Sequence, residues 1–188
     1  MKKKTILIDI DGCLNMYPAP LQLWAEVVSG LDNKSAKESI KKQNDFDYLK
    51  ETYRHSTVLN YLLPRDGASE TISYFKKTGY HIVLLSARNP AKNPEIKKTT
   101  EKWLEKYSIQ FDLLLFTKEK NKYIQQHLGE ILLVIEDEPQ ILETFDNLKT
   151  EIVVFKNELN DHLEHPHFHV VYSWKEIASL FEQLTATQ

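Results

Sequence analysis

Short apolar runs recur along the chain, and each is bounded by polar or turn residues. They are Thr5–Ile8, His81–Leu85, Leu113–Phe116, Ile131–Ile135 and Ile152–Phe155, with a weaker run at His169–Tyr172. Runs that are apolar at nearly every position are typical of strands whose two faces are both covered. The pattern therefore predicts buried strands in a parallel sheet.

Amphipathic segments with helical spacing lie between these runs. In the first of them Ile72 and Phe75 share one face, and Gly79 follows where a helix C-terminus favours glycine. Thr117 is a predicted N-cap for a later helix. The predicted helices are Ala68–Lys77, Pro94–Tyr107, Thr117–Leu128, Pro139–Leu148 and Trp174–Leu184. Strands that alternate with helices predict an α/β fold with right-handed crossovers and helices on both sides of the sheet.

The stretch Met16–Leu63 interrupts this alternation, because it contains no clear strand. Pro20–Ser29 and Asn33–Gln43 have helical character, and Phe46–Tyr53 is rich in aromatic residues. We therefore expect a small helical cap, residues 16–63, inserted into a core domain that residues 1–15 and 64–188 form.

Composition and charge narrow the range of partners. The length of 188 residues suits one domain with a small insertion. The net charge of −3 gives no reason to expect a nucleic-acid or membrane surface. The single cysteine excludes an intrachain disulfide, and no apolar run reaches the length of a membrane span. We expect a cytoplasmic protein with no membrane or stable nucleic-acid partner; the sequence predicts no oligomeric state.

Side chains that could take part in catalysis or bind a ligand follow four of the predicted strands. They are Asp9 and Asp11 after the first strand, Ser86, Ala87 and Arg88 after the second, Lys118, Lys120 and Lys122 after the third, and Glu136 and Asp137 after the fourth. Ligands of open parallel sheets bind at the carboxyl ends of the strands. Acids, a hydroxyl and cations at one edge suit a phosphate and a divalent metal ion.

Asp9 and Asp11 are spaced so that they can take different roles if the chain turns between them. One carboxylate can attack phosphorus while the other handles the proton of the leaving group. Taken alone, Asp-x-Asp-Gly is equally consistent with a turn that ends a strand. The residues at the other three strand ends favour a catalytic site.

The runs ILIDIDG, LLSAR and LVIEDEP, with a lysine that opens the helix after the third strand, resemble the four motifs of the haloacid dehalogenase (HAD) superfamily of phosphohydrolases. The resemblance extends from Thr5 to Phe155 and implies a Rossmann-like core with a small C1-type cap. It implies that Asp9 is the nucleophile, which forms an aspartyl-phosphate, and that Asp11 is the general acid and base. It further implies a phosphate site at Ser86, Ala87, Arg88 and Lys120, and a Mg²⁺ ion held by Asp9, Asp137 and the backbone carbonyl of Asp11.

Several of these assignments have alternatives. Glu136 would contact the metal directly or through water, and Lys118 is the second choice for the lysine at the phosphate. Arg88 would bind the substrate phosphate or form a salt bridge across the loop. Cys13 is more often a small buried filler than a reactive thiol at such a place. The histidine-rich stretch His162–His169 matches no known metal-ligand spacing, and we expect a surface loop there.

Within the superfamily the pattern is most similar to the 5′(3′)-deoxyribonucleotidase-like group and its uncharacterised bacterial relatives. The matching pieces include Pro64-Arg-Asp-Gly-Ala, Thr-Lys-Glu-Lys and Ile-Glu-Asp. The similarity implies a Mg²⁺-dependent nucleotidase that acts on (deoxy)nucleoside monophosphates. In the cap, Trp24, Phe46 and Tyr48 would stack on a base, or else form the hydrophobic core of the cap itself.

Two other functions compete with a nucleotidase. One is a phosphatase for another small phosphate or for nucleic-acid 3′-ends, and the absence of a basic stripe argues against the nucleic-acid substrate. The other is a non-catalytic binding module of the same fold. The presence of both Asp9 and Asp11 argues against the module.

Overall fold

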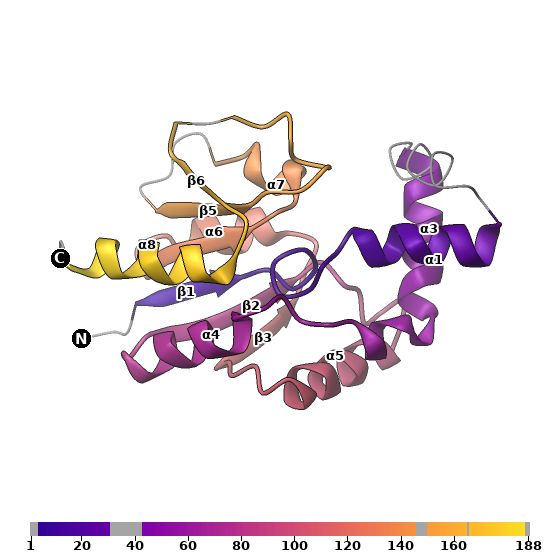
Figure 1. Cartoon of the computed structure of the whole chain (residues 1–188), viewed down its shortest axis with the longest axis horizontal. Helices are drawn as coiled ribbons and strands as arrows, with labels where there is room; N and C mark the ends of the chain where they lie inside the picture. Colours follow the sequence, from indigo (N-terminus) through magenta and orange to yellow (C-terminus); the bar gives the residue numbers. More distant parts are fainter. Residues whose placement is uncertain (1–3, 31–42, 146–149, 165, 187–188) are drawn as a thin grey trace.

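One parallel sheet of six strands forms the centre of the protein, in the order β3-β2-β1-β4-β5-β6 (Figure 1). The computed structural model describes residues 4–30, 43–145, 150–164 and 166–186. The strands are β1 (Thr5–Ile8), β2 (His81–Ser86), β3 (Leu113–Phe116), β4 (Ile131–Glu136), β5 (Glu151–Phe155) and β6 (Phe168–Val171). All six predicted strands are present, and the predicted α/β class is confirmed.

The strand order reverses at β1, which lies between β2 and β4. Ile8 is paired with Leu84 of β2 on one side and with Ile135 of β4 on the other. A crevice opens in such sheets at the carboxyl ends of the strands where the order reverses. The residues that follow β1, β2 and β4 are therefore brought to one place.

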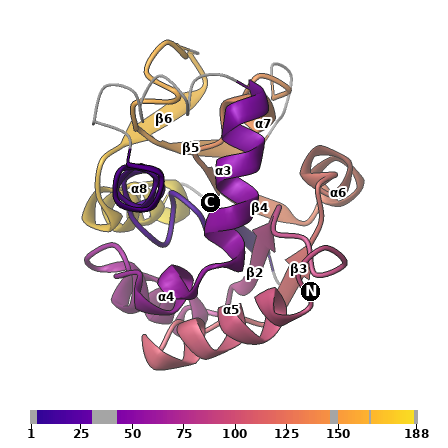
Figure 2. The ribbon, with the colours of Figure 1, turned by 90° about the vertical axis from the view of Figure 1, so that its right-hand side faces the viewer.

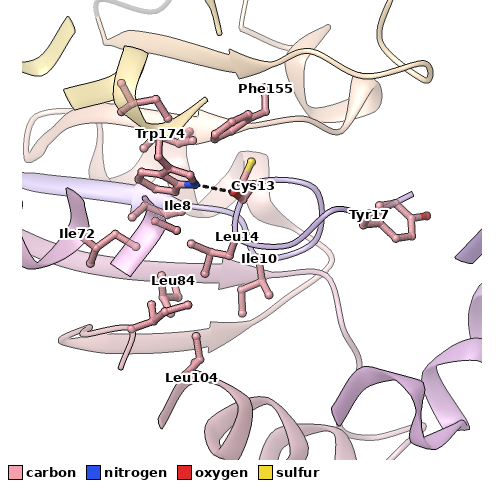
Figure 3. Close-up of a cluster of buried hydrophobic side chains, with 14 of the residues drawn as sticks. Ile8, Ile10, Cys13, Leu14, Tyr17, Ile72, Leu84, Leu104, Phe155 and Trp174 are labelled. Atoms are coloured by element: carbon pink, nitrogen blue, oxygen red, sulfur yellow. Dashed lines mark hydrogen bonds between the residues drawn. The ribbon is translucent and has the colours of Figure 1, made fainter. Parts of the chain in front are cut away.

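Helices cover both faces of the sheet. They are α4 (Ala68–Lys77), α5 (Glu95–Lys106) and α8 (Trp174–Ala186) on one face, and α6 (Lys120–His127) and α7 (Pro139–Leu142) on the other. Alternate strand residues separate into the two cores, because Ile6 and Ile8 pack with the first group and Leu7 with the second. Figure 3 shows the first core, in which the Trp174 indole Nε1 donates to the Cys13 carbonyl at 2.9 Å.

Two predicted helices differ from the structure by three or more residues at one end. Helix α6 begins at Lys120 rather than at Thr117, because the Thr117 hydroxyl accepts from the Glu119 N–H and stabilises a turn before the helix. Helix α7 ends at Leu142 rather than at residue 148. The Thr144 hydroxyl donates to the Ile141 carbonyl in the turn that follows α7.

A small helical insertion separates β1 from β2, as predicted. It contains α1 (Ala19–Ser29), α3 (Gln43–His55) and the 3₁₀ helix η1 (Thr57–Tyr61). The predicted helix Asn33–Gln43 lies outside the described residues except for Gln43, the first residue of α3. Figures 1 and 2 show α1 and α3 beyond the carboxyl ends of the strands, so that the insertion lies over the crevice.

The insertion leaves and rejoins the core at one point, where Asn15 and Pro64 form an antiparallel bridge. The Trp103 indole Nε1 of α5 also donates to the Leu62 carbonyl at 2.8 Å. These contacts agree with a cap of residues 16–63 on a core of residues 1–15 and 64–188, a division that stays a proposal. In the described part of the chain, every helix is too short or too polar to span a bilayer.

Candidate active site

The chain turns sharply out of β1 and places two carboxylates on different sides of the loop. The Asp9 N–H donates to the Ile135 carbonyl at 2.9 Å and continues the strand pairing by one residue. Gly12 then adopts a φ of +92°. A Cβ atom there would lie 1.9 Å from Oδ2 of Asp137, so only glycine fits this position.

The Asp9 carboxylate lies in a buried cluster of charges. Nζ of Lys120 is 2.6 Å from Asp9 Oδ1 and 2.9 Å from Glu136 Oε2. All three side chains are almost completely excluded from solvent. Burial alone would lower the pKa of Lys120, but the carboxylates of Asp9 and Glu136 raise it well above its usual value, so the lysine stays charged.

Glu136 orients this lysine. Its Oε1 accepts from the backbone N–H groups of Asp137 and Glu138 at 3.0 and 3.1 Å, and its Oε2 faces Lys120. The carboxylate therefore has a partner on each oxygen, and the structure places it against the lysine. Contact of Glu136 with the metal, directly or through water, stays a prediction; the group suited to a metal among the described residues contains Asp9, Cys13 and Asp137.

Asp9 and Asp137 form the candidate metal site. Their carboxylate oxygens and the Cys13 sulfur all lie within 4.8 Å of one another. Burial raises the pKa of both carboxyl groups. Lys120 acts in the opposite direction, but Glu136 raises both pKa values further, together with Asp11 for Asp9 and with Asp9 for Asp137. Two buried carboxylates with excess negative charge suit a hard divalent cation such as Mg²⁺. The residues present therefore fit the expected cofactor.

The loop after β5 supports Asp137, and sequence reasoning missed this contribution. Asn157 donates from Nδ2 to Asp137 Oδ2 at 2.8 Å, and Asn160 donates from Nδ2 to the Asp137 carbonyl at 2.8 Å. Asparagines after a strand are typical of turns, so there was no reason in the sequence to connect them with Asp137. Their spacing, three residues apart in one loop, was the only sequence feature that could have indicated a shared contact.

The Asp11 carboxylate has cationic and neutral donors around it. Arg88 donates from Nε to Oδ2 at 3.1 Å and from Nη2 to Oδ1 at 2.7 Å, and Asn15 donates to Oδ1 at 3.0 Å. Nη2 of Arg54, from α3 of the cap, is 3.9 Å from Oδ2. Burial by itself would raise the pKa of Asp11, but Arg88, Arg54 and the Asn15 hydrogen bond hold it well below its usual range.

The remaining sequence candidates occupy different places. Ser86 is buried, and its hydroxyl accepts from the Arg88 N–H at 3.2 Å, while Ala87 lines the cavity beside the two aspartates. Of the two alternatives for Arg88, the structure shows the salt bridge. Lys118 and Lys122 are exposed, whereas Lys120 is buried and pairs with Asp9 and Glu136.

A cavity of about 420 Å³ opens between the strand ends and the cap. Its lining comprises Asp9, Asp11, Tyr17, Lys50, Arg54, Ala87, Lys120, Asp137, Glu138, Pro139, Gln140, Glu158, Leu159 and His162. The volume suits a small molecule. The sequence did not single out the cap residues Tyr17, Lys50 and Arg54, because lysine and arginine on an amphipathic helix read as solvent-facing.

The predicted aromatic platform does not line this cavity. Trp24 packs edge-to-face on Tyr53, with ring centroids 6.1 Å apart, and contributes to the core of the cap. Tyr48 is exposed and is absent from the cavity lining. The Phe46 side chain lies outside the described residues. For Trp24 and Tyr48 the alternative of a purely structural or surface role fits the geometry.

The structure agrees with Cys13 as a small buried side chain and with a surface position for His162 in the histidine-rich stretch. Burial raises the pKa of the Cys13 thiol, and Asp137 and Asp9 raise it further, so the unreactive thiol predominates. His162 is exposed and reaches the edge of the cavity, which the expected surface loop had not indicated. His169 in β6 pairs with Glu151 at 2.7 Å, away from the site.

No protein-family model matches the chain, and no curated protein matches it in sequence. Solved structures match its fold. A variant of CbbY from Rhodobacter sphaeroides in complex with xylulose-(1,5)-bisphosphate aligns with a TM-score of 0.61 at 13% identity, over 93% of this chain and 96% of that chain. A HAD family hydrolase from Deinococcus radiodurans R1 with bound phosphate and sodium gives 0.61 at 13% identity, over 97% and 96%. D,D-heptose 1,7-bisphosphate phosphatase from Burkholderia thailandensis gives 0.56 at 12% identity, over 96% and 99%. The chain therefore has the α/β fold of HAD-type hydrolases.

Proposed function

We propose that this protein is a Mg²⁺-dependent phosphomonoester hydrolase in which Asp9 is the nucleophile. The observation that carries the proposal is the Asp9 carboxylate at the floor of a small-molecule cavity, 2.6 Å from the buried Lys120 ammonium and beside Asp137. A carboxylate, a cation and a metal site around one point match the requirements of phosphoryl transfer.

Asp9 and Asp137 would hold the metal ion, together with the Asp11 backbone carbonyl that the family resemblance implies. When bound, the ion neutralises charge on the phosphoryl oxygens. Its two positive charges also compensate the excess negative charge that raises the pKa of both buried carboxyl groups. The acidic cluster therefore supports a metal ion on the Asp9 side of the loop.

In the first step an Asp9 oxygen attacks phosphorus, and the bond between phosphorus and the alcohol oxygen breaks. The products are an aspartyl-phosphate and the alcohol, whose oxygen takes its proton from Asp11. In the second step water attacks phosphorus, gives its proton to Asp11, and Asp9 leaves as a free carboxylate with inorganic phosphate as product. Asp11 thereby returns to its starting protonation state.

For Asp11 to act as an acid, its hydrogen-bond and ion-pair partners have to change. Arg88 and Arg54 hold it ionised in this structure, which suits a base that receives the proton of water. To donate a proton, Asp11 has to lose the bidentate contact with Arg88. A substrate phosphoryl group that draws the Arg88 guanidinium away would achieve this, since guanidinium binds phosphate in the same two-pronged way as carboxylate.

Three groups would hold the transferring phosphoryl group. The Ser86 hydroxyl and the Ala87 backbone lie at the end of β2, and Lys120 lies at the start of α6. Preorganised donors of this kind typically contribute about 10²–10³-fold to the rate each. Lys120 has a second function, because its charge keeps the attacking oxygen of Asp9 oriented.

The substrate is a small phosphorylated molecule, since the cap encloses a cavity of limited volume. The finer hypothesis, from resemblance, is a (deoxy)nucleoside monophosphate. Two of the structural neighbours contain or act on sugar bisphosphates by name, so sugar phosphates belong in the same comparison. A panel of 5′- and 3′-nucleotides and sugar phosphates, ranked by kcat/KM, distinguishes these classes.

Hydrolysis of 4-nitrophenyl phosphate with and without Mg²⁺ tests the proposed activity. We expect turnover that depends on Mg²⁺ and is lost in Asp9→Asn, with an unchanged Tm. Lys122→Gln serves as the matched control, because Lys122 is exposed and pairs only loosely with Glu119. Equal turnover in wild-type protein and Asp9→Asn would refute the proposal.

A further inference from the structure

Two hydrogen-bond donors of the cap that line the cavity, the Tyr17 hydroxyl and the Arg54 guanidinium, have no hydrogen-bond acceptor among the described residues. The Tyr17 side chain is 6% exposed, and its hydroxyl is fully buried without a hydrogen-bond partner. The Arg54 side chain is 11% exposed, and the carboxylates with which it pairs among the described residues, those of Asp11 and Glu51, are each 3.9 Å away, beyond hydrogen-bonding distance. A buried donor without an acceptor costs about 1–3 kcal/mol. Such donors in a ligand cavity indicate that a ligand supplies the acceptor.

Both donors lie on the same wall. Tyr17 and Arg54 line the cavity with Lys50, whose Nζ is 5.5 Å from the centre of the Tyr17 ring. Figure 3 shows the Tyr17 ring on the cap side of the core cluster, well separated from Trp174 and Phe155. Tyr17, Lys50 and Arg54 are called the cap wall below.

The acidic residues of the cavity leave the Arg54 guanidinium without a hydrogen-bonded carboxylate among the described residues. Asp11 accepts two hydrogen bonds from Arg88, and Glu138 lies between Lys50 at 4.0 Å and Lys120 at 3.8 Å. Glu158 is a further acidic residue in the lining. Arg54 therefore has a full positive charge next to the cavity and no carboxylate within hydrogen-bonding distance among the described residues.

The position of Asp11 shows which part of the substrate would meet this wall. Asp11 gives its proton to the leaving oxygen, so the alcohol portion of the substrate extends from the Asp11 side of the reaction centre. Arg54 is the cap residue that approaches Asp11. In the proposed reaction the transferring phosphoryl group would lie on the other side, next to the paired Asp9 and Lys120.

We propose that the cap wall binds an anionic group on the leaving alcohol, so that the preferred substrate is a phosphomonoester whose alcohol bears a second anionic group, a carboxylate or a phosphate. This inference rests on the proposed function and names its substrate class. Guanidinium and a tyrosine hydroxyl together supply charge-assisted hydrogen bonds to such an oxygen group. Simple nucleoside monophosphates, whose alcohol is uncharged, are then poorer substrates than esters of anionic alcohols.

Binding of phosphonates, which are not hydrolysed, tests the cap wall independently of turnover. Isothermal titration with Mg²⁺ present compares propylphosphonate with 3-phosphonopropionate, which adds a carboxylate, and with propane-1,3-bisphosphonate, which adds a second phosphonate. We expect at least one of the two probes with a second anionic group to bind wild-type protein about tenfold or more tightly than propylphosphonate, and the stronger one identifies the group.

Three variants locate the effect. Arg54→Gln should abolish the preference for the second anionic group, and Tyr17→Phe should reduce it about threefold or more. Tyr17→Phe should leave the Tm unchanged or higher, because the hydroxyl it removes has no partner in the protein. Lys122→Gln removes one exposed charge and should retain the full preference.

The outcomes separate the two proposals. Equal binding of all three phosphonates to wild-type protein, or a preference that Arg54→Gln retains, would overturn the cap wall. A preference that all variants lose in equal measure, including Lys122→Gln, would overturn it as well, since only net charge would then matter. Hydrolysis of 4-nitrophenyl phosphate in the same preparations reports on the phosphatase itself, so phosphatase activity without any preference would contradict the cap wall alone.

Discussion

Asp9 and Asp11 are two residues apart, yet the protein gives them opposite surroundings. Asp9 faces the core, where Glu136 and Asp137 are buried beside it and Lys120 is the single nearby cation among the described residues. Asp11 faces α5 and the cap, where Arg88, Arg54 and Asn15 all stabilise the ionised form. Burial raises the pKa of Asp9, whereas the arginines hold the pKa of Asp11 low.

This contrast supports the proposal that one loop supplies carboxylates for two chemical roles. The Asp9 side has excess negative charge and suits a divalent cation, and the proposed metal ion and phosphoryl group would therefore lie there. The Asp11 side has excess positive charge and suits a base, and later an anionic leaving group. Environments that drive two carboxyl pKa values apart are the usual means of assigning acid and base roles.

The largest expected effect on activity comes from removing the Asp9 carboxylate. Asp9→Asn should lower kcat by about 10⁴-fold or more, because a carboxamide does not attack phosphorus. Steady-state hydrolysis of 4-nitrophenyl phosphate measures the loss, and circular dichroism checks the fold. Retention of more than a few per cent of the wild-type rate would contradict the nucleophilic role.

The next largest effect on activity comes from removing the Asp11 carboxylate. Asp11→Asn should lower kcat for an alkyl phosphate by about 10²–10⁴-fold, since its alcohol needs a proton to leave. The loss in the rate of enzyme phosphorylation should be smaller with 4-nitrophenyl phosphate, whose leaving group departs as an anion. Rapid-quench comparison of the two substrates measures the difference; equal losses in that step would remove Asp11 from the proton transfer.

The Lys120 ammonium pairs with the carboxylates of both Asp9 and Glu136. Removing this charge should therefore affect both the rate of hydrolysis and the stability of the fold. Lys120→Met should lower kcat by about 10²–10³-fold. It also leaves buried carboxylates unpaired, which should cost about 3–5 kcal/mol of unfolding free energy in urea titrations. Lys118→Met is the matched control and should change neither quantity.

A smaller effect sharpens the assignment of the metal to the Asp9 side. Asn157→Ala removes the hydrogen bond to Asp137 Oδ2 and should raise the Mg²⁺ concentration for half-maximal activity about 10–100-fold. Asn160→Ala, which loses bonds to backbone carbonyls of Asp137 and Phe155, should instead lower the Tm. Identical Mg²⁺ dependence in wild-type protein and Asn157→Ala would argue against Asp137 as a ligand.

The smallest effect concerns a third aspartate that is ionised for structural reasons. Burial by itself would raise the pKa of Asp112, but the group accepts from the Ile82 N–H at 2.8 Å and pairs with Lys76 at 2.6 Å, and these contacts together lower its pKa. Its lowered pKa contributes stability above the unfolded pKa of 3.8, and this contribution disappears as the pH falls through the lower folded pKa.

Asp112→Asn should therefore cost about 1 kcal/mol at neutral pH, and the difference from wild-type protein should shrink below about pH 4. Urea titrations at several pH values measure it. A difference that grows at low pH would contradict the ionised role.

The strands and the reaction centre were predictable for a physical reason. Buried parallel strands are continuous apolar runs, and in a parallel sheet their carboxyl ends meet, so Asp9, Ser86 and Asp137 had to be neighbours. Lys120 was preferred among three lysines, and the structure places it alone of the three against Asp9.

The cap side of the site was not predictable in the same way. Arg54 and Tyr17 reach the cavity because of how α1 and α3 pack over the sheet, and no short sequence pattern encodes that packing. The end of α7 was also missed, since the Thr144 hydroxyl competes for a helix carbonyl in the turn that stops it. Contacts between distant segments decide such features.

The most direct test of the contrast between the two aspartates is to identify the phosphorylated residue. Wild-type protein is mixed with Mg²⁺ and 4-nitrophenyl phosphate, quenched in acid, reduced with borohydride and analysed by peptide mass spectrometry; reduction converts an aspartyl-phosphate to homoserine. We expect homoserine at position 9 and an unmodified Asp11. Homoserine at position 11, or at neither position despite rapid turnover, would contradict the assignment of Asp9 as nucleophile.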